Sequence, residues 1–176
     1  MSASLNVMTV RPPFDEVYCE FLPRIRGFLR TKLTDPTDAD DVAADVFARA
    51  LRAYPRYEPR CGTPAAWLFR IARNAAFDHQ RRTGQRRHAE SAAVETWREL
   101  EDPCQWAEQR FLHRELRYAI ARLPQRQREV MSLRLEGGLS YREIGQQLGC
   151  TDDAAKMLYH RSLRALRPLL TEGMAA

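Results

Sequence analysis

Apolar residues recur along this chain mostly at intervals of three and four, which is the spacing of one face of an α-helix. Signals for strands are weak throughout. The pattern predicts a first helix over residues 14–33, and its apolar positions are Val17, Phe21, Ile25, Phe28 and Leu29. Pro23 lacks a backbone donor and can kink this helix. The chain is therefore predicted to be all-α.

A second helix is expected over about residues 39–53, after a break at residues 34–36. Thr37 or Asp38 is the expected cap, because short polar side chains accept hydrogen bonds from the first free N–H groups. Acidic residues crowd the first turn, where the helix dipole favours them. Residues 54–62 contain two prolines and a glycine, which predict a loop.

A third helix is predicted from the signals at its two ends. Thr63 is the expected cap, and Pro64 occupies the first helical position, where a missing N–H costs nothing. The helix is expected to end near Arg82, before Gly84. Much of its apolar surface is expected from Trp67, Leu68, Ile71, Ala75 and Phe77.

The charge changes sign in the middle of the chain. Residues 64–87 hold six arginines and one aspartate, whereas residues 88–109 hold one arginine and six carboxylates. An acidic stretch between basic blocks is typical of a linker between domains. The sequence therefore predicts two small helical domains joined by an acidic linker.

The last third of the chain predicts a helix over about residues 110–121 and another that opens at Pro124 and stops at residues 137–138. Ser140 and Glu143 then form a capping box, in which each side chain bonds the other residue's backbone N–H. The short helix that they open is expected to end at Gly149.

Thr151 is expected to cap a final, longer helix that ends at about Arg167, before Pro168. Two helices joined by a glycine turn, the second of them basic, predict a helix-turn-helix. Ile144 and Leu148 are expected to pack against Ala155, Leu158 and Leu163.

The formal net charge is +5, and only Lys32 and Lys156 of the 28 basic residues are lysines. This balance favours an anionic partner, nucleic acid before a membrane surface. A basic stripe on the last helix comprises Lys156, His160, Arg164 and Arg167, with Arg161 beside it. The stripe can face a major groove; a solvated face on a terminal helix is the alternative.

Several classes of function are disfavoured. The four cysteines lie more than forty residues apart, without a CxxC pair or zinc-ligand spacing, so reduced thiols and no metal or cofactor are expected. Neither a secretory signal nor a membrane-spanning run is present, which predicts a cytoplasmic protein. The histidines are scattered and no catalytic motif is recognisable, so an enzyme is not expected.

Four runs carry a resemblance to a known family. Residues 38–47 (DADDVAADVF) and 66–74 (AWLFRIARN) resemble the second region of sigma-70-family factors, and residues 123–130 (LPQRQREV) and 138–144 (GLSYREI) resemble the fourth. With only these two regions and a short linker, the chain resembles the extracytoplasmic-function (ECF) group. The resemblance implies a factor that binds core RNA polymerase and directs promoter-specific initiation.

The resemblance also implies a division of the chain. A region 2-like domain over residues 14–87 would bind the polymerase clamp and melt the −10 element. A linker over residues 88–109 would lead to a region 4-like helix-turn-helix domain over residues 110–170, which would read the −35 duplex. Tails are expected over residues 1–13 and 171–176.

Site residues are carried over from the family by matching its motifs. The residues implied for docking on the β′ clamp are Asp41, Asp45, Phe47 and Arg49. Those implied for the −10 strand are Tyr57, Cys61, Gly62, Thr63, Arg70, Arg73, Asn74, Arg81 and Arg82. Those implied for the −35 duplex are Ser140, Tyr141, Lys156, His160, Arg161 and Arg164.

Physical chemistry supports the −10 assignment. A flipped base needs a group such as the Asn74 amide to hydrogen-bond its edge, and the backbone of a single strand needs a positively charged groove. Trp67 follows the apolar pattern of its helix, which favours core packing over base stacking. The resemblance further implies contact with the polymerase β flap and a regulatory anti-sigma protein.

Three other classes of protein remain as alternatives. A repressor or activator could carry the same C-terminal half, but it would not need the helix of residues 66–74, the acidic helix or the linker. An enzyme lacks a recognisable motif. A helical interaction protein that mimics an anti-sigma factor should be acidic where DNA would bind, and the two basic blocks argue against it.

Overall fold

The computed structural model describes residues 11–173, apart from residue 34 and residues 60–61, 85–115 and 117–118. Every regular element in this part of the chain is a helix, which confirms the all-α prediction. The predicted linker lies outside the described residues. So does most of the helix expected over 110–121, of which residues 116 and 119–121 are described and helical.

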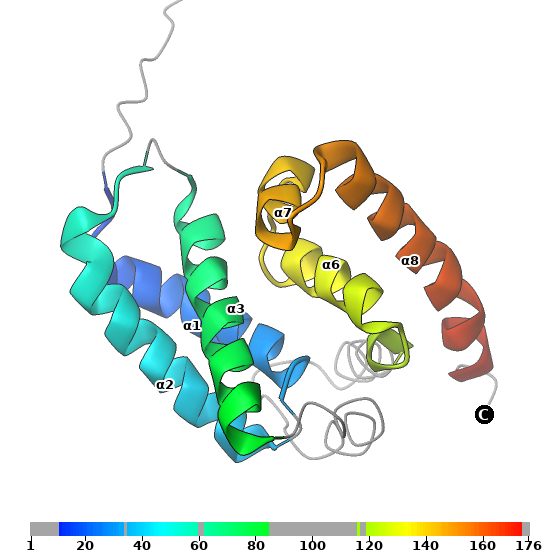
Figure 1. Cartoon of the computed structure of the whole chain (residues 1–176), viewed down its shortest axis with the longest axis horizontal. Helices are drawn as coiled ribbons and strands as arrows, with labels where there is room; N and C mark the ends of the chain where they lie inside the picture. The colour runs from blue at the N-terminus through cyan, green and yellow to red at the C-terminus, as the bar shows by residue number, and fades with distance from the viewer. Residues whose placement is uncertain (1–10, 34, 60–61, 85–115, 117–118, 174–176) are drawn as a thin grey trace, which may run out of the picture.

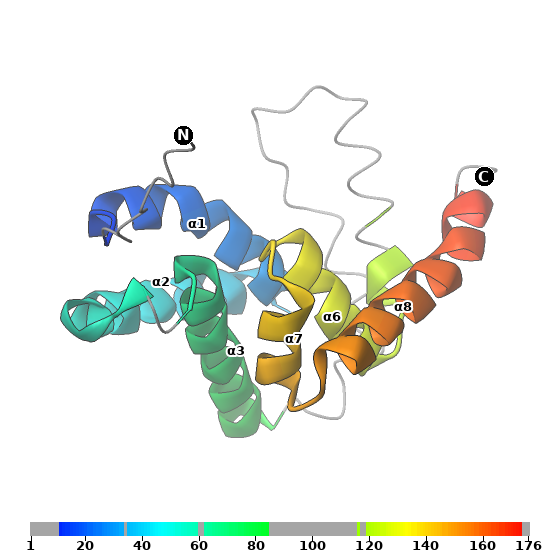
Figure 2. The same cartoon turned by 90° about the horizontal axis from the view of Figure 1, so that it is seen from above.

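The helices form two groups that lie side by side (Figure 1). The first group comprises α1 (Phe14–Arg30), α2 (Pro36–Ala53), the short 3-10 helix η1 (Tyr54–Arg56) and α3 (Pro64–Thr83). The second comprises α6 (Gln125–Leu135), α7 (Tyr141–Leu148) and α8 (Asp152–Gly173). Figure 2 shows from above that α3 and α7 face one another where the groups meet.

The ends of α1 and α2 differ from the prediction. The first helix ends at Arg30, three residues early, because the Thr31 hydroxyl and N–H both bond the carbonyl of Phe28. The second begins at Pro36, and its cap is Asp35, whose carboxylate accepts from the Thr37 N–H at 2.8 Å. The expected caps Thr37 and Asp38 are therefore wrong, because a proline at the first helical position shifts the cap to the residue before it.

The predicted ends of α3 and α7 are confirmed. Thr63 accepts from the Ala66 N–H at 3.2 Å, and the capping box of Ser140 and Glu143 has both of its hydrogen bonds. Gly84 and Gly149 follow α3 and α7 with φ of 66°, in the left-handed region that glycine tolerates best.

The last helix begins as expected and ends later. The Thr151 hydroxyl accepts from the Ala154 N–H at 3.2 Å, but α8 runs to Gly173 with Pro168 inside it. Pro168 therefore removes one donor without stopping the helix. Leu163, expected inside, is exposed, and the neighbouring Ser162 and Leu166 are buried instead.

Buried apolar residues form one connected cluster across both groups of helices. Phe28 and Phe69 are fully buried in it, with their rings edge to face and their centroids 5.2 Å apart. Phe77, expected among the apolar contacts of α3, is 47% exposed. The shared core fixes α3 at the side of the first group that meets the second, with one face available to solvent and its first turn against α7.

Candidate nucleic-acid interface

The loop before α3 is built on stacked aromatic rings. The buried Tyr57 ring stacks on Tyr54, with centroids 5.8 Å apart, and leans against Trp67 at 4.9 Å. The Tyr57 hydroxyl donates to the Gly62 carbonyl at 2.8 Å. Gly62 has a φ of 141°, a conformation that other residues rarely adopt. Trp67 packs in this cluster, as its place in the apolar pattern indicated.

A pocket lies between this loop, α3 and α7. Tyr57, Gly62, Trp67 and Arg70 contribute to its wall on one side. On the other side the wall is formed by three polar residues of α7, which are Glu143, Gln146 and Gln147. Two parts of the chain that lie far apart in the sequence therefore enclose one pocket with aromatic, cationic and amide groups.

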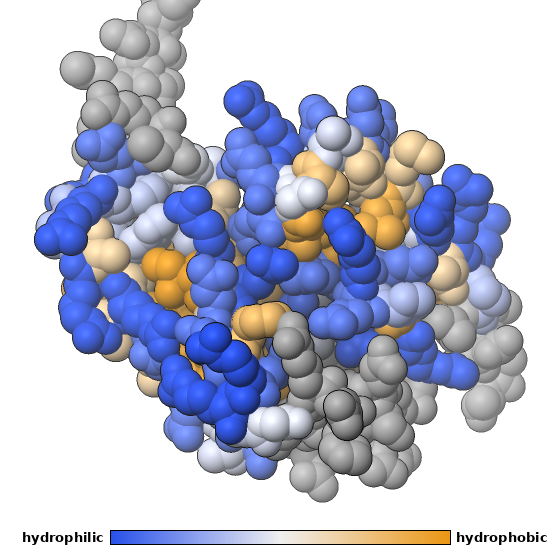
Figure 3. All heavy atoms as spheres, viewed as in Figure 1, coloured by the Kyte–Doolittle hydropathy of each residue, from blue (hydrophilic) through white to orange (hydrophobic). Residues whose placement is uncertain are grey.

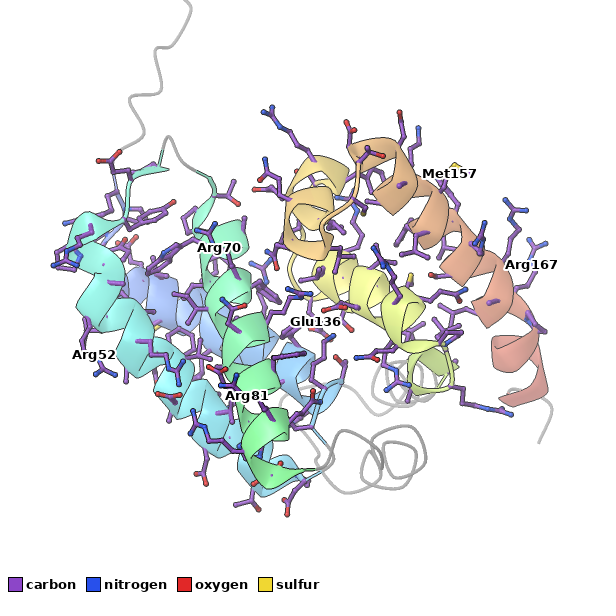
Figure 4. All side chains as sticks on the ribbon, in the orientation of Figure 1. Arg52, Arg70, Arg81, Glu136, Met157 and Arg167 are labelled. Atoms are coloured by element: carbon purple, nitrogen blue, oxygen red, sulfur yellow. The ribbon has the colours of Figure 1, made fainter. Side chains whose placement is uncertain are left out.

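The other residues predicted for the −10 strand lie along α3. Arg70, Asn74 and Arg81 are exposed and spaced by four and seven residues, so they share one face of the helix. Figure 4 shows Arg70 and Arg81 near opposite ends of α3. Asn74 lies one turn beyond the pocket and does not line it. Arg82 is exposed at the end of the helix, and Cys61 lies outside the described residues.

Arg73 points instead into a partly buried ionic cluster between the two groups of helices. Its Nε donates to Glu129 Oε1 at 2.8 Å, and Lys32 Nζ lies 3.0 Å from the same oxygen. Burial would raise the pKa of Glu129, but Lys32 and Arg73 outweigh it and bring the pKa below its ordinary value. Burial lowers the pKa of Lys32, despite the attraction of Glu129. Contacts at such sequence separation leave no periodic pattern, so sequence reasoning missed this cluster.

We expect Glu129→Gln to lower the free energy of unfolding by about 1–3 kcal/mol at neutral pH, because Lys32 and Arg73 lose their countercharge. A carboxylate with a lowered pKa stabilises the fold above its ordinary pKa near 4.5, and this contribution is lost as the pH falls through the lower folded-state value. Urea unfolding between pH 7 and pH 3 should show the difference from wild type shrinking on acidification. A pH-independent difference would contradict the ionic role. The exposed Glu16→Gln is the control.

The residues predicted to bind polymerase are divided between the surface and the core of the first group. Asp41 is exposed, and Asp45 pairs with Arg49 at 2.6 Å. Phe47 is buried, and its ring lies edge to face with Tyr18 at 4.8 Å. Phe47 therefore holds α2 against α1, while the acidic side chains remain near the surface.

The basic residues of α8 surround a shallow hollow. Lys156, His160, Arg161 and Arg164 line it, and Met157, 65% exposed, contributes apolar surface. Figure 4 shows Met157 near the start of α8 and Arg167 near its far end. In Figure 3, apolar patches over α7 and the start of α8 are bordered by hydrophilic residues. Sequence reasoning placed four of these side chains together and did not include Met157.

Ser140 and Tyr141, also predicted for the −35 duplex, have contacts within the protein. Ser140 serves the capping box. The ring centroids of Tyr141 and Tyr159 are 5.8 Å apart, and the Arg134 guanidinium lies over the Tyr141 ring, 5.0 Å from its centroid. These contacts position α7 against α8. Within the described residues, no helix is both long and apolar enough to span a membrane, and no group of three histidine, cysteine or carboxylate side chains could hold a metal ion.

Comparison with known proteins agrees with this arrangement. Sigma-70 region 2 matches residues 17–87, and sigma-70 region 4 matches residues 113–166. The chain is 32% identical to the RNA polymerase sigma factor CarQ of Myxococcus xanthus over 163 residues, which is 90% of each chain. It is 35% identical to the ECF sigma factor ShbA of Streptomyces griseus over 84% of this chain and 82% of that one.

Two solved structures are similar. The sigma factor RpoE from Bartonella quintana, in complex with the anti-sigma factor NepR, has a TM-score of 0.69 and 25% identity, over 90% of this chain and 96% of that one. CnrH, in complex with the cytosolic domain of CnrY, has a TM-score of 0.62 and 23% identity, over 90% of this chain and 88% of that one. At this identity the similarity shows a shared fold alone. Both sequence relatives are RNA polymerase sigma factors. Two matched regions and these identities show that the chain belongs to the sigma-70 family of RNA polymerase sigma factors, in its ECF group.

Proposed function

We propose that this sigma factor selects promoters through two contacts made by different parts of the chain. The first group of helices, within residues 14–87, binds the polymerase clamp and opens the −10 element. The second, within residues 110–170, binds the −35 duplex. The observation that carries the proposal is the presence of two separate basic faces, one on α3 beside an aromatic-walled pocket and one on α8, the second helix of the helix-turn-helix.

The α3 face suits single-stranded DNA. A flipped base needs a pocket with an apolar wall and polar groups for its edge, and Tyr57, Trp67 and Arg70 supply such a wall. Arg81 and Arg82 continue the basic face toward the end of the helix, where a strand's phosphates can follow. We infer that Asn74, which is exposed on the same face between Arg70 and Arg81, reads a base that leaves the stack.

The α8 face suits duplex DNA. A recognition helix contacts base edges in the major groove from one side, and the exposed cations of α8 lie along one side. Joining two modest contacts in one chain raises the effective concentration of the second. A linker over residues 88–109 would set the distance between them.

The acidic side of α2, including Asp41 and Asp45, is the proposed contact with the polymerase β′ clamp, because carboxylates complement basic surfaces. The β flap is the proposed partner of the second group. The cytoplasm, which holds the polymerase, is the proposed site of action. Because the similar structure of RpoE contains the anti-sigma factor NepR, an anti-sigma protein is the proposed regulator.

Transcription in vitro tests the proposal. Purified chain and sigma-free core polymerase are incubated with a pool of genomic promoter fragments, and the start sites are mapped. We expect discrete starts that share a −35/−10 pair and require the chain. Retention of duplex DNA without polymerase binding or initiation would instead identify an operator-binding repressor or activator, provided that the same core initiates with a known sigma factor.

We expect Asn74→Ala to reduce discrimination between wild-type and −10-mutant promoters by about tenfold, since one well-placed base contact is worth about 1–3 kcal/mol. Binding to polymerase should be unchanged. The measurement is the ratio of transcripts from the two promoters at matched polymerase occupancy. Gln125→Ala, which removes an exposed amide from the start of α6, is the control. Equal discrimination by both variants and wild type would remove Asn74 from the site.

A further inference from the structure

The outward face of α8 carries one apolar side chain among polar ones. Ala155 and Leu166 are buried in the shared core, and Leu158 and Tyr159 pack against it, so these residues mark the inward face. The residues that line the hollow lie on the opposite side of the helix and are all exposed: Asp153, Lys156, Met157, His160, Arg161 and Arg164. Met157 is the apolar exception in this set.

The fold does not require a methionine at this position. The Met157 side chain is 65% exposed, whereas Met131 of α6 is 1% exposed in the core. Apolar surface that stays in water contributes nothing to the hydrophobic stabilisation of the fold. Figure 4 shows Met157 on the outer side of α8, away from the first group of helices. Its contribution is therefore to be sought in a contact with a ligand.

The neighbours of Met157 identify the kind of ligand. Residues three and four apart on a helix are adjacent, so His160 and Arg161 flank Met157 on one side and Asp153 on the other. The hollow holds three permanent cations and one carboxylate, which favours a polyanion such as duplex DNA. A duplex that reaches these cations also reaches the methionine.

The chemistry of methionine restricts what it can recognise on DNA. Its thioether has no donor and only a weak acceptor, so it cannot form the hydrogen bonds that distinguish most bases. The one apolar group that the base edges present in the major groove is the 5-methyl group of thymine. An unbranched side chain with three rotatable bonds can adapt its end to such a small target.

The position of Met157 along α8 suits a base edge. Recognition helices contact bases mainly with residues near their N-terminus, and Met157 lies in the second turn of a helix that begins at Asp152. Asp153, one turn before Met157, repels phosphates, whereas Arg164 lies two turns further on. The early end of the hollow is therefore better suited to base edges, and the later end to the DNA backbone.

Resting on the binding of duplex DNA proposed for α8, we infer that Met157 determines part of the sequence specificity: its side chain contacts the 5-methyl group of a thymine in the major groove and selects that base at one position. The cations beside it bind phosphates and contribute affinity for any sequence. Loss of a cation should weaken binding to every duplex, and loss of the Met157 side chain should weaken binding only where the methyl group is present.

Deoxyuridine provides the test, because it pairs as thymidine does and lacks only the 5-methyl group. Full-length protein first enriches its preferred duplex from a library of random-sequence duplexes. Each thymine of the enriched duplex is then replaced in turn by deoxyuridine, and binding is measured by fluorescence anisotropy. Met157→Ala is measured on the same set of duplexes, and alanine preserves the helix because it has the highest helix propensity.

We expect one replacement to weaken binding of the wild type about fourfold, which is the effect of exposing one buried methyl group. Met157→Ala should bind the thymine and deoxyuridine duplexes equally, so the effects of the two changes should not add. Met157→Leu, which keeps an apolar side chain, should retain most of the preference. Leu163→Ala is the matched control, because Leu163 is also an exposed apolar residue of α8 but does not line the hollow.

Two results would overturn the role of Met157. One is an enriched duplex on which no deoxyuridine replacement weakens binding of the wild type. The other is a methyl preference that persists undiminished in Met157→Ala, because a property of the DNA itself or another residue would then be responsible. Failure of the wild type to enrich any duplex would instead contradict the proposed binding of duplex DNA by α8, and the inference would fall with it.

Discussion

Replacing Arg161 and Arg164 together with alanine is expected to weaken binding to promoter duplex about 10- to 100-fold at physiological salt. Both side chains are exposed and line the hollow on α8, with Lys156 and His160. Each phosphate contact releases a bound counterion. The loss of two cations should therefore also reduce the slope of the logarithm of the binding constant against the logarithm of salt concentration by about two. Arg161→Ala alone should show part of both effects.

The measurement is fluorescence anisotropy of a labelled −35 duplex at several salt concentrations. The matched control is Arg52→Ala/Arg122→Ala, which removes the same charge from exposed positions outside α8. Figure 4 shows Arg52 on α2, on the side of the molecule away from α8. Equal losses for the two double variants would mean that net charge, and not the α8 face, governs duplex binding.

Phe69→Ala is expected to lower the free energy of unfolding by about 3–5 kcal/mol, because it removes a ring from a packed core and leaves a cavity. Phe69 is fully buried, and its ring meets Phe28 edge to face. A loss of this size is a large part of the stability of a typical domain, about 5–15 kcal/mol in total. Urea unfolding at pH 7, followed by circular dichroism, measures it.

Phe77→Ala provides a control on the same helix with the same residue type. Its ring is 47% exposed, so less apolar surface returns to water and the expected loss is about 1 kcal/mol or less. Similar losses at the two positions would contradict the core that the structure shows. This pair also separates effects of packing from effects of helix propensity, since both changes introduce alanine into α3.

Local signals in the sequence predicted most of the helices and several of their ends. Thr63 with Pro64, and Ser140 with Glu143, act through backbone groups only a few residues away, so their pattern is readable along the chain. The same logic failed at α2, where two candidate caps were considered and Asp35, before Pro36, is the cap.

Periodicity was less reliable for deciding which apolar residues are buried. Phe77 and Leu163 both follow a helical apolar pattern, yet each is exposed because it lies on a face that no described helix covers. Burial depends on the position of neighbouring helices, and periodicity specifies only the face. The same limit explains Arg73, which has the residue type and spacing of a DNA contact but bonds Glu129, 56 residues later in the chain.

Glu143 has consequences for how this protein can vary between lineages. One oxygen of its carboxylate completes the cap of α7, and the other accepts the hydroxyl of Thr63 in the opposite group of helices. A glutamate codon becomes a glutamine codon by a single base change, and glutamine preserves the cap. Natural selection could therefore adjust how tightly the two halves hold one another by one nucleotide substitution, without rebuilding the helix-turn-helix.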